Sequence, residues 1–194
     1  MSNARPASPS TPVKITQSPL PGVLVIEPRV HGDARGFFVE TFRESELVEA
    51  GLTARFVQDN HSRSRRGTLR GMHYQLQHPQ GKLVRVSRGR VFDVAVDVRR
   101  GSPCFGQWFG MELDDVRHQM MYVPPGFAHG FLVLSEEADF VYKCTDYYHL
   151  ASERGVAWND PEIAIRWPEI GAPILSTKDG QLPSLAGQSE LPVY

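Results

Sequence analysis

The sequence is poor in cysteine, in excess charge and in long apolar runs, and each shortage excludes a class of protein. Its 194 residues include two cysteines, Cys104 and Cys144, which form no CxxC motif, so a disulfide-rich scaffold is excluded. We interpret both as reduced thiols of a cytoplasmic protein, with a single disulfide as the alternative. The net charge of −1 gives no broad basic surface, so nucleic acid is not an expected partner. Any anion site must therefore be a local cluster of Arg and Lys.

The chain also lacks segments that would place it in or across a membrane. No apolar run approaches the roughly 18–20 residues of a membrane span, and the N-terminus has no apolar stretch of the kind that signal peptides carry. We therefore expect a cytoplasmic protein with no membrane partner. Residues 1–18, rich in Ser, Pro and Ala, are expected to form a flexible arm. Residues 19–194 are expected to form a single domain, because a chain of this length supports one good core.

What the chain does contain is a succession of short β-strand patterns. Residues 91–98 alternate strictly: the even-numbered Phe and Val residues face one way, and Asp93, Ala95 and Asp97 face the other. A strand-like run begins at Leu69, and the one convincing helical pattern, residues 44–52, is short and closed by Gly51. Many short strands without intervening helices predict an all-β fold, an antiparallel sandwich or barrel. Further candidate strands span residues 22–30, 36–42, 82–89, 105–113, 118–124, 129–135 and 138–148.

Residues 124–131, PPGFAHGF, place a Pro-Gly turn just before His129 and a new strand. This stretch is similar to the second of the two half-motifs that bind metal in cupin jelly rolls. The first half-motif needs two histidines two residues apart, but the residue two positions after His73 is Gln75. His78 lies in a Pro-flanked turn, where its ring would not obviously converge. Since a transition metal needs three or four converging ligands, we expect no metal site.

Taken singly, the other candidate residues have ordinary structural explanations. A lone strand histidine such as His73 is more often a core or rim residue than a catalyst, and Lys82 could cap a turn after Gly81. Tyr142 would by default be a sheet aromatic with its hydroxyl near water. Asp179 looks like a turn aspartate, and Arg35 and Arg70 could be surface charges.

Their order along the chain changes this interpretation. Nine stretches follow one another from about residue 20 to residue 180: GDARGFFVETF, FVQDNHSRS, LRGMHYQ, QGKLVRV, GRVFDVAVDVRRGSPCFGQW, YVPPGFAHGF, FVYKCTDYY, WNDPEIAIRWP and LSTKD. In these stretches and in their order the chain resembles the dTDP-4-dehydrorhamnose 3,5-epimerases, sugar-nucleotide epimerases of deoxyhexose biosynthesis. The resemblance implies a cupin-type jelly roll that uses neither metal nor cofactor and that assembles as a homodimer through strand exchange.

The resemblance also implies a catalytic set. His73 occupies the position of the base that removes a proton beside the substrate ketone, a role that suits a group with an unperturbed pKa of about 6.5. Asp179 matches the carboxylate that orients this base. Lys82 matches a lysine that faces the developing enolate oxygen, where a fixed cation stabilises charge that appears during the reaction. Tyr142 matches the acid that returns a proton from the opposite face, because a phenol with a pKa near 10 stays protonated at neutral pH.

The remaining matched positions imply a pocket for a dTDP-sugar. Arg35 and Arg70 correspond to diphosphate and substrate contacts, where a guanidinium can bind phosphate oxygens in bidentate fashion. Glu40 and the run Gln58, Asp59 and Asn60 match contacts to the thymidine nucleotide and sugar, which can come from the neighbouring subunit in the family. Met72 and Tyr74 replace the commoner Leu and Phe beside the base. The other implied binding residues are His129, Tyr148, Glu153 and Lys178.

Several functions share this pattern. Related enzymes epimerise only one of the two carbons, act on other deoxyhexose intermediates, or isomerise the ketone. A non-catalytic cupin that binds a sugar nucleotide is an alternative of another class, although a binder would not need the set His73, Lys82, Tyr142 and Asp179. A metal-dependent cupin dioxygenase is disfavoured by its missing ligands.

Overall fold

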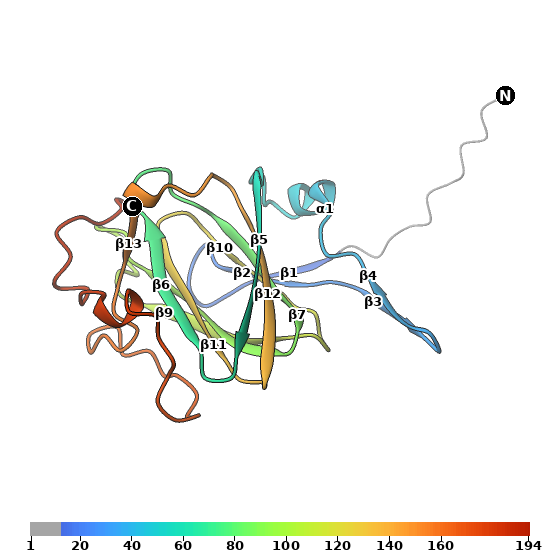
Figure 1. Cartoon of the computed structure of the whole chain (residues 1–194). Helices are drawn as coiled ribbons and strands as arrows, with labels where there is room; N and C mark the ends of the chain where they lie inside the picture. Colours follow the sequence, from blue (N-terminus) through green and yellow to red (C-terminus); the bar gives the residue numbers. More distant parts are fainter. Residues whose placement is uncertain (1–12) are drawn as a thin grey trace.

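Two β-sheets face each other and form the body of the molecule (Figure 1). The computed structural model describes residues 13–194, and neighbouring strands within each sheet pair antiparallel. The all-β prediction is therefore confirmed. The six-stranded sheet has the order β1 (Lys14–Gln17), β2 (Leu24–Glu27), β10 (Met120–Val123), β7 (Lys82–Arg88), β12 (Glu137–Cys144) and β5 (Gln58–Arg65). The five-stranded sheet has the order β13 (Glu153–Gly155), β6 (Leu69–Gln75), β11 (Phe127–Val133), β8 (Arg90–Asp97) and β9 (Trp108–Asp114).

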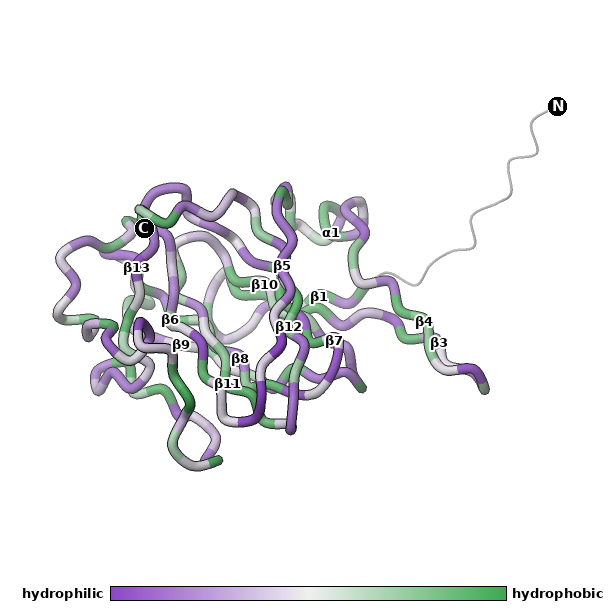
Figure 2. The backbone as a smooth tube through the Cα atoms, in the orientation of Figure 1, coloured by the Kyte–Doolittle hydropathy of each residue, from purple (hydrophilic) through white to green (hydrophobic). Residues whose placement is uncertain are grey.

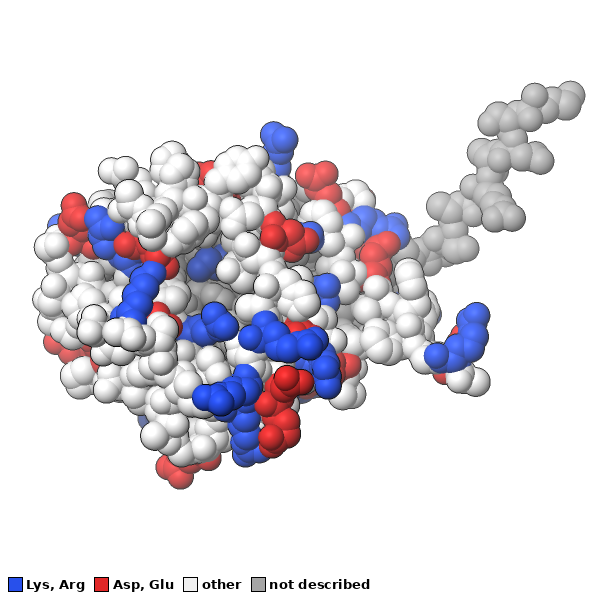
Figure 3. Space-filling model, viewed as in Figure 1, with Lys and Arg blue, Asp and Glu red and all other residues white. Residues whose placement is uncertain are grey.

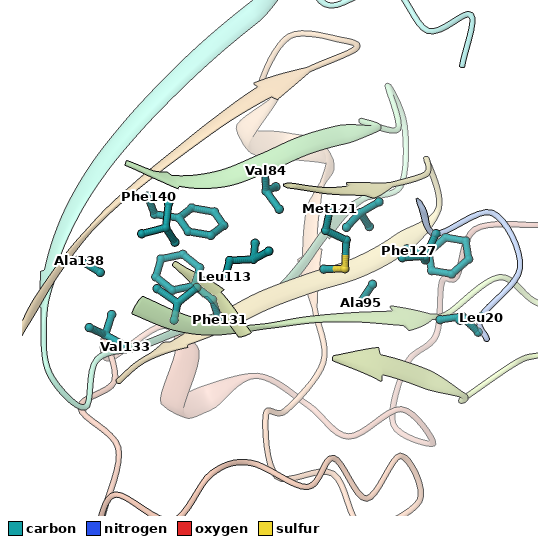
Figure 4. Packing of buried hydrophobic residues seen from close by; sticks show 14 residues of the cluster. Leu20, Val84, Ala95, Leu113, Met121, Phe127, Phe131, Val133, Ala138 and Phe140 are labelled. Carbon is teal, nitrogen blue, oxygen red and sulfur yellow. The ribbon is translucent and has the colours of Figure 1, made fainter. Parts of the chain in front are cut away.

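The main core lies between the two sheets. Phe140 from β12 stacks on Phe131 from β11, with ring centroids 4.1 Å apart (Figure 4). Val84 from β7 and Ala95 from β8 are buried in the same cluster. Side chains from both sheets thus fill the space between them together.

The strict alternation of residues 91–98 has a consequence for both faces of the five-stranded sheet. Val94 and Val96 point away from the space between the sheets and are buried under the C-terminal segment, where they pack with Ile163 and Leu185. The opposite face of β8 carries Ala95 into the main core. Because the C-terminal segment covers the outer face (orange to red in Figure 1), the sheet is buried on both sides.

Two parts of the sheet differ from the sequence predictions. A flexible arm is expected over residues 1–18, of which residues 1–12 lie outside the described residues. Within the described part, Lys14–Gln17 form β1 and pair with β2. Ile15 holds this strand in place because it packs against a hydrophobic cluster that contains Ile26. Strand β5 was not predicted, since its sequence QDNHSRSR is polar throughout. It forms because alternate side chains face the pocket and the solvent, and neither face needs an apolar row.

A two-stranded hairpin, β3 (Val30–Asp33) and β4 (Gly36–Val39), stands away from the two sheets (Figure 1). Its side chains Phe37 and Phe38 are 60% and 67% exposed, and Figure 2 shows apolar residues along it. A short helix, α1 (Glu44–Glu49), follows, and Gly51 has a left-handed φ of 91° just after it. Two single-turn 3-10 helices, η1 (Leu150–Ser152) and η2 (Asp179–Gln181), complete the regular structure. None of the helices within residues 13–194 is long and apolar enough to cross a membrane.

Candidate active site

A pocket of about 460 Å³ opens between the two sheets. In the space-filling view the surface is hollowed between β6 and β5, and Lys and Arg side chains gather around this hollow (Figure 3). The predicted catalytic residues, which come from β6, β7, β12 and η2, all line the pocket. They are His73, Lys82, Tyr142 and Asp179.

His73 and Asp179 form a hydrogen-bonded pair although they are 106 residues apart. The distance between His73 Nε2 and Asp179 Oδ1 is 2.7 Å, and the Asp179 side chain is only 6% exposed. Burial raises the pKa of Asp179, but the hydrogen bond from His73 and the backbone N–H of Gly71 together hold this pKa below its ordinary value. Asp179 is therefore an ionised carboxylate that can orient the ring and stabilise its protonated form. The ring nitrogen Nδ1 of His73 is left for another partner.

A close approach of two strands places this pair. Gly71 on β6 has a φ of 116°, and a Cβ atom there would lie 2.6 Å from Gly130 Cα on β11. Only glycine allows the backbones to approach so closely. Gly71 also donates its N–H to Asp179 Oδ2 at 3.4 Å, so the same glycine serves the strand contact and the carboxylate.

Lys82 and Tyr142 lie on adjacent strands of the opposite sheet. Lys82 is the first residue of β7, and its register partner on β12 is Cys144. Tyr142 lies two residues before Cys144 on β12, so its side chain is on the same face of the sheet as that of Cys144. Burial lowers the pKa of Lys82 and raises the pKa of Tyr142, because each group loses water around its charged form. No carboxylate within residues 13–194 forms an ion pair with Lys82. Its charge is thus available to a bound molecule.

A second histidine–aspartate pair lies beside the first. His129 on β11 is the register partner of His73, and its Nε2 lies 2.9 Å from Asp93 Oδ1. Asp93 on β8 is fully buried, and its Oδ2 has no hydrogen-bond partner among the described residues. The alternation of residues 91–98 places Asp93 on the face opposite the Val residues, but the sequence motifs do not mark it as a site residue. The signal was a charged residue on an inward-facing strand position, which is rare unless the residue is paired.

The two histidines do not form a metal site in the part of the chain that the structure describes. Each binds its own carboxylate, and no group of three His, Cys, Asp or Glu side chains within residues 13–194 is placed to hold a metal ion. Gln75, at the position where cupins have their second histidine, donates its amide to the carbonyl oxygens of His78 and Tyr147. It holds two loops together rather than facing an ion.

Four of the ten predicted binding residues line an adjoining pocket of about 200 Å³ that shares His73, Lys82 and Tyr142 with the first: they are Gln58, Asn60, Tyr148 and Glu153. Tyr148 donates its hydroxyl to Glu153 at 2.8 Å, and this hydrogen bond raises the pKa of Tyr148 to about 12. Lys178 forms an ion pair with the same carboxylate and lines the main pocket. The other predicted binding residues at the main pocket are Arg70 and His129.

Three predicted binding residues do not reach either of these pockets. Arg35 lies at the turn of the β3–β4 hairpin, where its side chain is 90% exposed and paired with Asp33. Glu40 forms an ion pair with Arg43. Asp59 is exposed on β5 and pairs with Lys143. The single chain therefore brings together the predicted catalytic residues but only part of the predicted binding set.

A family model described as dTDP-4-dehydrorhamnose 3,5-epimerase matches residues 17–187. The chain belongs to this epimerase family. It is 56% identical over 170 residues to the dTDP-4-dehydrorhamnose 3,5-epimerase of Pseudomonas aeruginosa, which covers 87% of this chain and 94% of that relative. Epimerases of this name are isomerases, so the resemblance found in the sequence motifs is confirmed.

Solved structures and other relatives place the fold and the range of the family. An epimerase from Legionella pneumophila, determined in complex with dTDP-4-keto-L-rhamnose, superposes with a TM-score of 0.92 at 50% identity and covers 94% of this chain and 98% of that chain. The jelly-roll prediction is confirmed by this likeness. A Streptomyces niveus relative, 42% identical over 178 residues that cover 89% of this chain and 86% of that protein, is named a dTDP-4-dehydrorhamnose 3-epimerase. The epimerase fold therefore serves both double and single epimerisation.

Proposed function

We propose that this epimerase-family chain inverts both carbons that flank the ketone of a dTDP-4-keto-6-deoxyhexose. The reaction converts dTDP-4-dehydro-6-deoxy-glucose to dTDP-4-dehydro-rhamnose. The observation that carries the proposal is the His73–Asp179 pair, which lies in one pocket with Tyr142 and with Lys82, a lysine that has no ion pair within residues 13–194. The 56% identity to a 3,5-epimerase supports two inversions rather than one.

The first step is removal of a proton from a carbon beside the ketone. With the Nε2–H of His73 donating to Asp179, Nδ1 carries the lone pair that takes the proton. Asp179 then holds the imidazolium that forms, and this favours the transfer. The electron pair of the broken C–H bond moves to the ketone oxygen and gives an enolate.

The second step returns a proton from the other face. Lys82 holds the negative charge of the enolate oxygen, and because burial removes water from around its charged group, the interaction is stronger than at a surface. Tyr142 lies on the sheet opposite to His73, so its hydroxyl can donate to the face that His73 does not reach. Each step uses a side chain of the protein itself, and the proposal therefore includes no cofactor.

Deuterium uptake tests the proposal. Proton NMR of the dTDP-sugar in deuterated water should show exchange at both flanking carbons together with the inverted product. His73→Asn should abolish both, since losing a general base costs about 10²–10⁴-fold, while leaving dTDP binding nearly intact. Exchange at one carbon alone would establish the single-carbon alternative, and normal exchange by the His73 variant would refute the base assignment.

We further propose that the protein acts as a homodimer in which the β3–β4 hairpin completes the site of the partner subunit. Arg35 is remote from the pockets of its own chain around His73, and the hairpin exposes Phe37 and Phe38, which a second copy would cover. We place the enzyme in the cytoplasm, where its free thiols stay reduced.

Subunit mixing tests this arrangement. Arg35→Ala and His73→Asn should each be inactive alone, yet mixed subunits should recover about a quarter of the wild-type activity, because each heterodimer regains one intact site. A mixture that stays inactive while size-exclusion chromatography shows heterodimers would mean that Arg35 acts within its own chain.

A further inference from the structure

The segment that follows Asp179 is fastened to the strand beside β6. Leu182 packs directly on Gly155 of β13, where a Cβ atom would come within 2.7 Å of a Leu182 methyl group. The N–H of Ala157 donates to the carbonyl oxygen of Pro183 at 2.8 Å. We call residues 182–185 the strap. Because Gly155 is the register partner of His73, the strap ties the carboxylate side of the catalytic pair to the strand next to the base.

Asp160 is the anchor of this strap. Its side chain is 2% exposed, and Oδ2 accepts the N–H of Leu185 at 2.7 Å. Oδ1 accepts the N–H groups of Glu162 and Ile163 at 2.8 and 2.9 Å. One buried carboxylate thus accepts three backbone hydrogen bonds, and through them it joins a turn that follows β13 to the end of the strap. These hydrogen bonds are strong because the acceptor is charged.

The packing around Leu185 links this anchor to the base. Leu185 is buried in the cluster that contains Met72 and Tyr74, the two neighbours of His73 in sequence. On the other side, Asp179 donates its N–H to Ser176 Oγ at 3.0 Å. The position of Asp179 is therefore fixed on its N-terminal side by Ser176. On its C-terminal side it is fixed by the strap, whose last residue is bound by Asp160.

We propose that Asp160 is a positioning residue that fixes the distance between Asp179 and His73. It does not line the pocket around His73, so it acts on the reaction only through the strap. This inference rests on the proposed function, because it assigns Asp160 a part in aligning the base of that reaction.

Asp160→Asn separates the two contacts of the carboxylate, one with the turn at Glu162 and Ile163 and one with Leu185 of the strap. The amide oxygen can still accept from Glu162 and Ile163, but the amide nitrogen would face the N–H of Leu185, and two donors cannot bond. Since a displacement of about 1 Å in a catalytic group can cost about 10²-fold in rate, we expect kcat to fall about 10- to 100-fold. KM and dTDP affinity should change less than kcat, because Arg70 and Tyr148 are carried by other segments and Lys178 is the one proposed binding residue next to Asp179.

Three comparisons make the test specific. In an Asp179→Asn background, Asp160→Asn should have little further effect on kcat, because the group that it positions has lost its charge. Asp114→Asn is the matched control: Asp114 is also buried and accepts the N–H groups of Val116 and Arg117, so it should lower thermal stability and leave kcat unchanged. Leu182→Ala loosens the strap at a half-buried position and should lower kcat if Asp160→Asn does not fold.

The outcomes distinguish the inference from the function on which it rests. A fall in kcat that is equally large with and without Asp179 would overturn the positioning role, as would a wild-type kcat in both folded strap variants. An inactive wild-type protein would instead refute the proposed epimerase. An Asp160→Asn effect that disappears in the Asp179→Asn background, with KM changed less than kcat, supports the inference.

Discussion

Replacing Lys82 by Met should affect activity and stability in opposite directions. Lys82 makes no ion pair within residues 13–194, and burial lowers its pKa, so its charge destabilises the folded chain; we propose that the charge serves the reaction. Removing one preorganised donor to a developing oxyanion costs about 10²–10³ in kcat, or about 2.7–4 kcal/mol. We expect a loss of kcat within this range. Methionine keeps the volume and the apolar stem, so the variant should unfold at a higher temperature than the wild type.

The pH dependence follows from the direction of the pKa shift. Since the pKa of Lys82 is lower in the folded chain than its ordinary value of 10.5, the unfolded chain binds more protons between these two values, and wild-type stability rises with pH there. The destabilisation is fully present below the folded pKa and is lost above 10.5. The thermal advantage of Lys82→Met should therefore be largest below the folded pKa and shrink as the pH rises from that pKa towards 10.5.

Two measurements check this prediction, with Lys14→Met as a control because Lys14 is exposed on β1 and paired with Glu27. Deuterium exchange by NMR gives the loss of enolate formation, and thermal unfolding followed at several pH values gives the stability difference. Exchange near the wild-type rate would show that Lys82 does not hold the enolate. A lower unfolding temperature for the variant at neutral pH would show that the lysine is compensated in the folded chain.

Three further predictions concern the other polar groups. Tyr142→Phe should still exchange deuterium into the sugar but give little inverted product, because His73 can return a deuteron only to the face it came from; equal loss of both in one NMR time course would exclude Tyr142 as the acid. Arg70→Ala should weaken dTDP binding about 10- to 100-fold, as expected for a lost charge-assisted contact, and calorimetry with unchanged affinity would leave Arg70 without a role in phosphate binding. Arg63 lowers the pKa of Asp139 from 3.8 to about 2, so the stability that Asp139 adds is present above pH 3.8 and lost as the pH falls towards 2. Asp139→Asn should therefore be less stable than the wild type at neutral pH and equal to it in acid, and a constant difference in acid titrations would contradict this.

The sequence alone identified most of the strands and the chemical types in the site. Strand period places every second side chain on one face, and this was enough to set Asp93 and Ala95 opposite the Val residues of β8. The motif order was enough to select His73, Lys82 and Tyr142. Local pattern could not reveal β5, because a strand with two polar faces has no hydrophobic period.

Only the tertiary structure decided which groups meet. Asp93 and Asp97 share one face of β8, yet Asp93 binds His129 and Asp97 binds Arg99. Asp179 reaches His73 because the C-terminal segment buries Leu185 over the outer face of the five-stranded sheet. These contacts join residues far apart in the chain, so they depend on how the whole segment packs and not on any local preference. The sequence therefore determined which residue types are present at the pocket. Long-range packing determined which of them pair, because the free energy of apolar burial is gained only when distant segments come together.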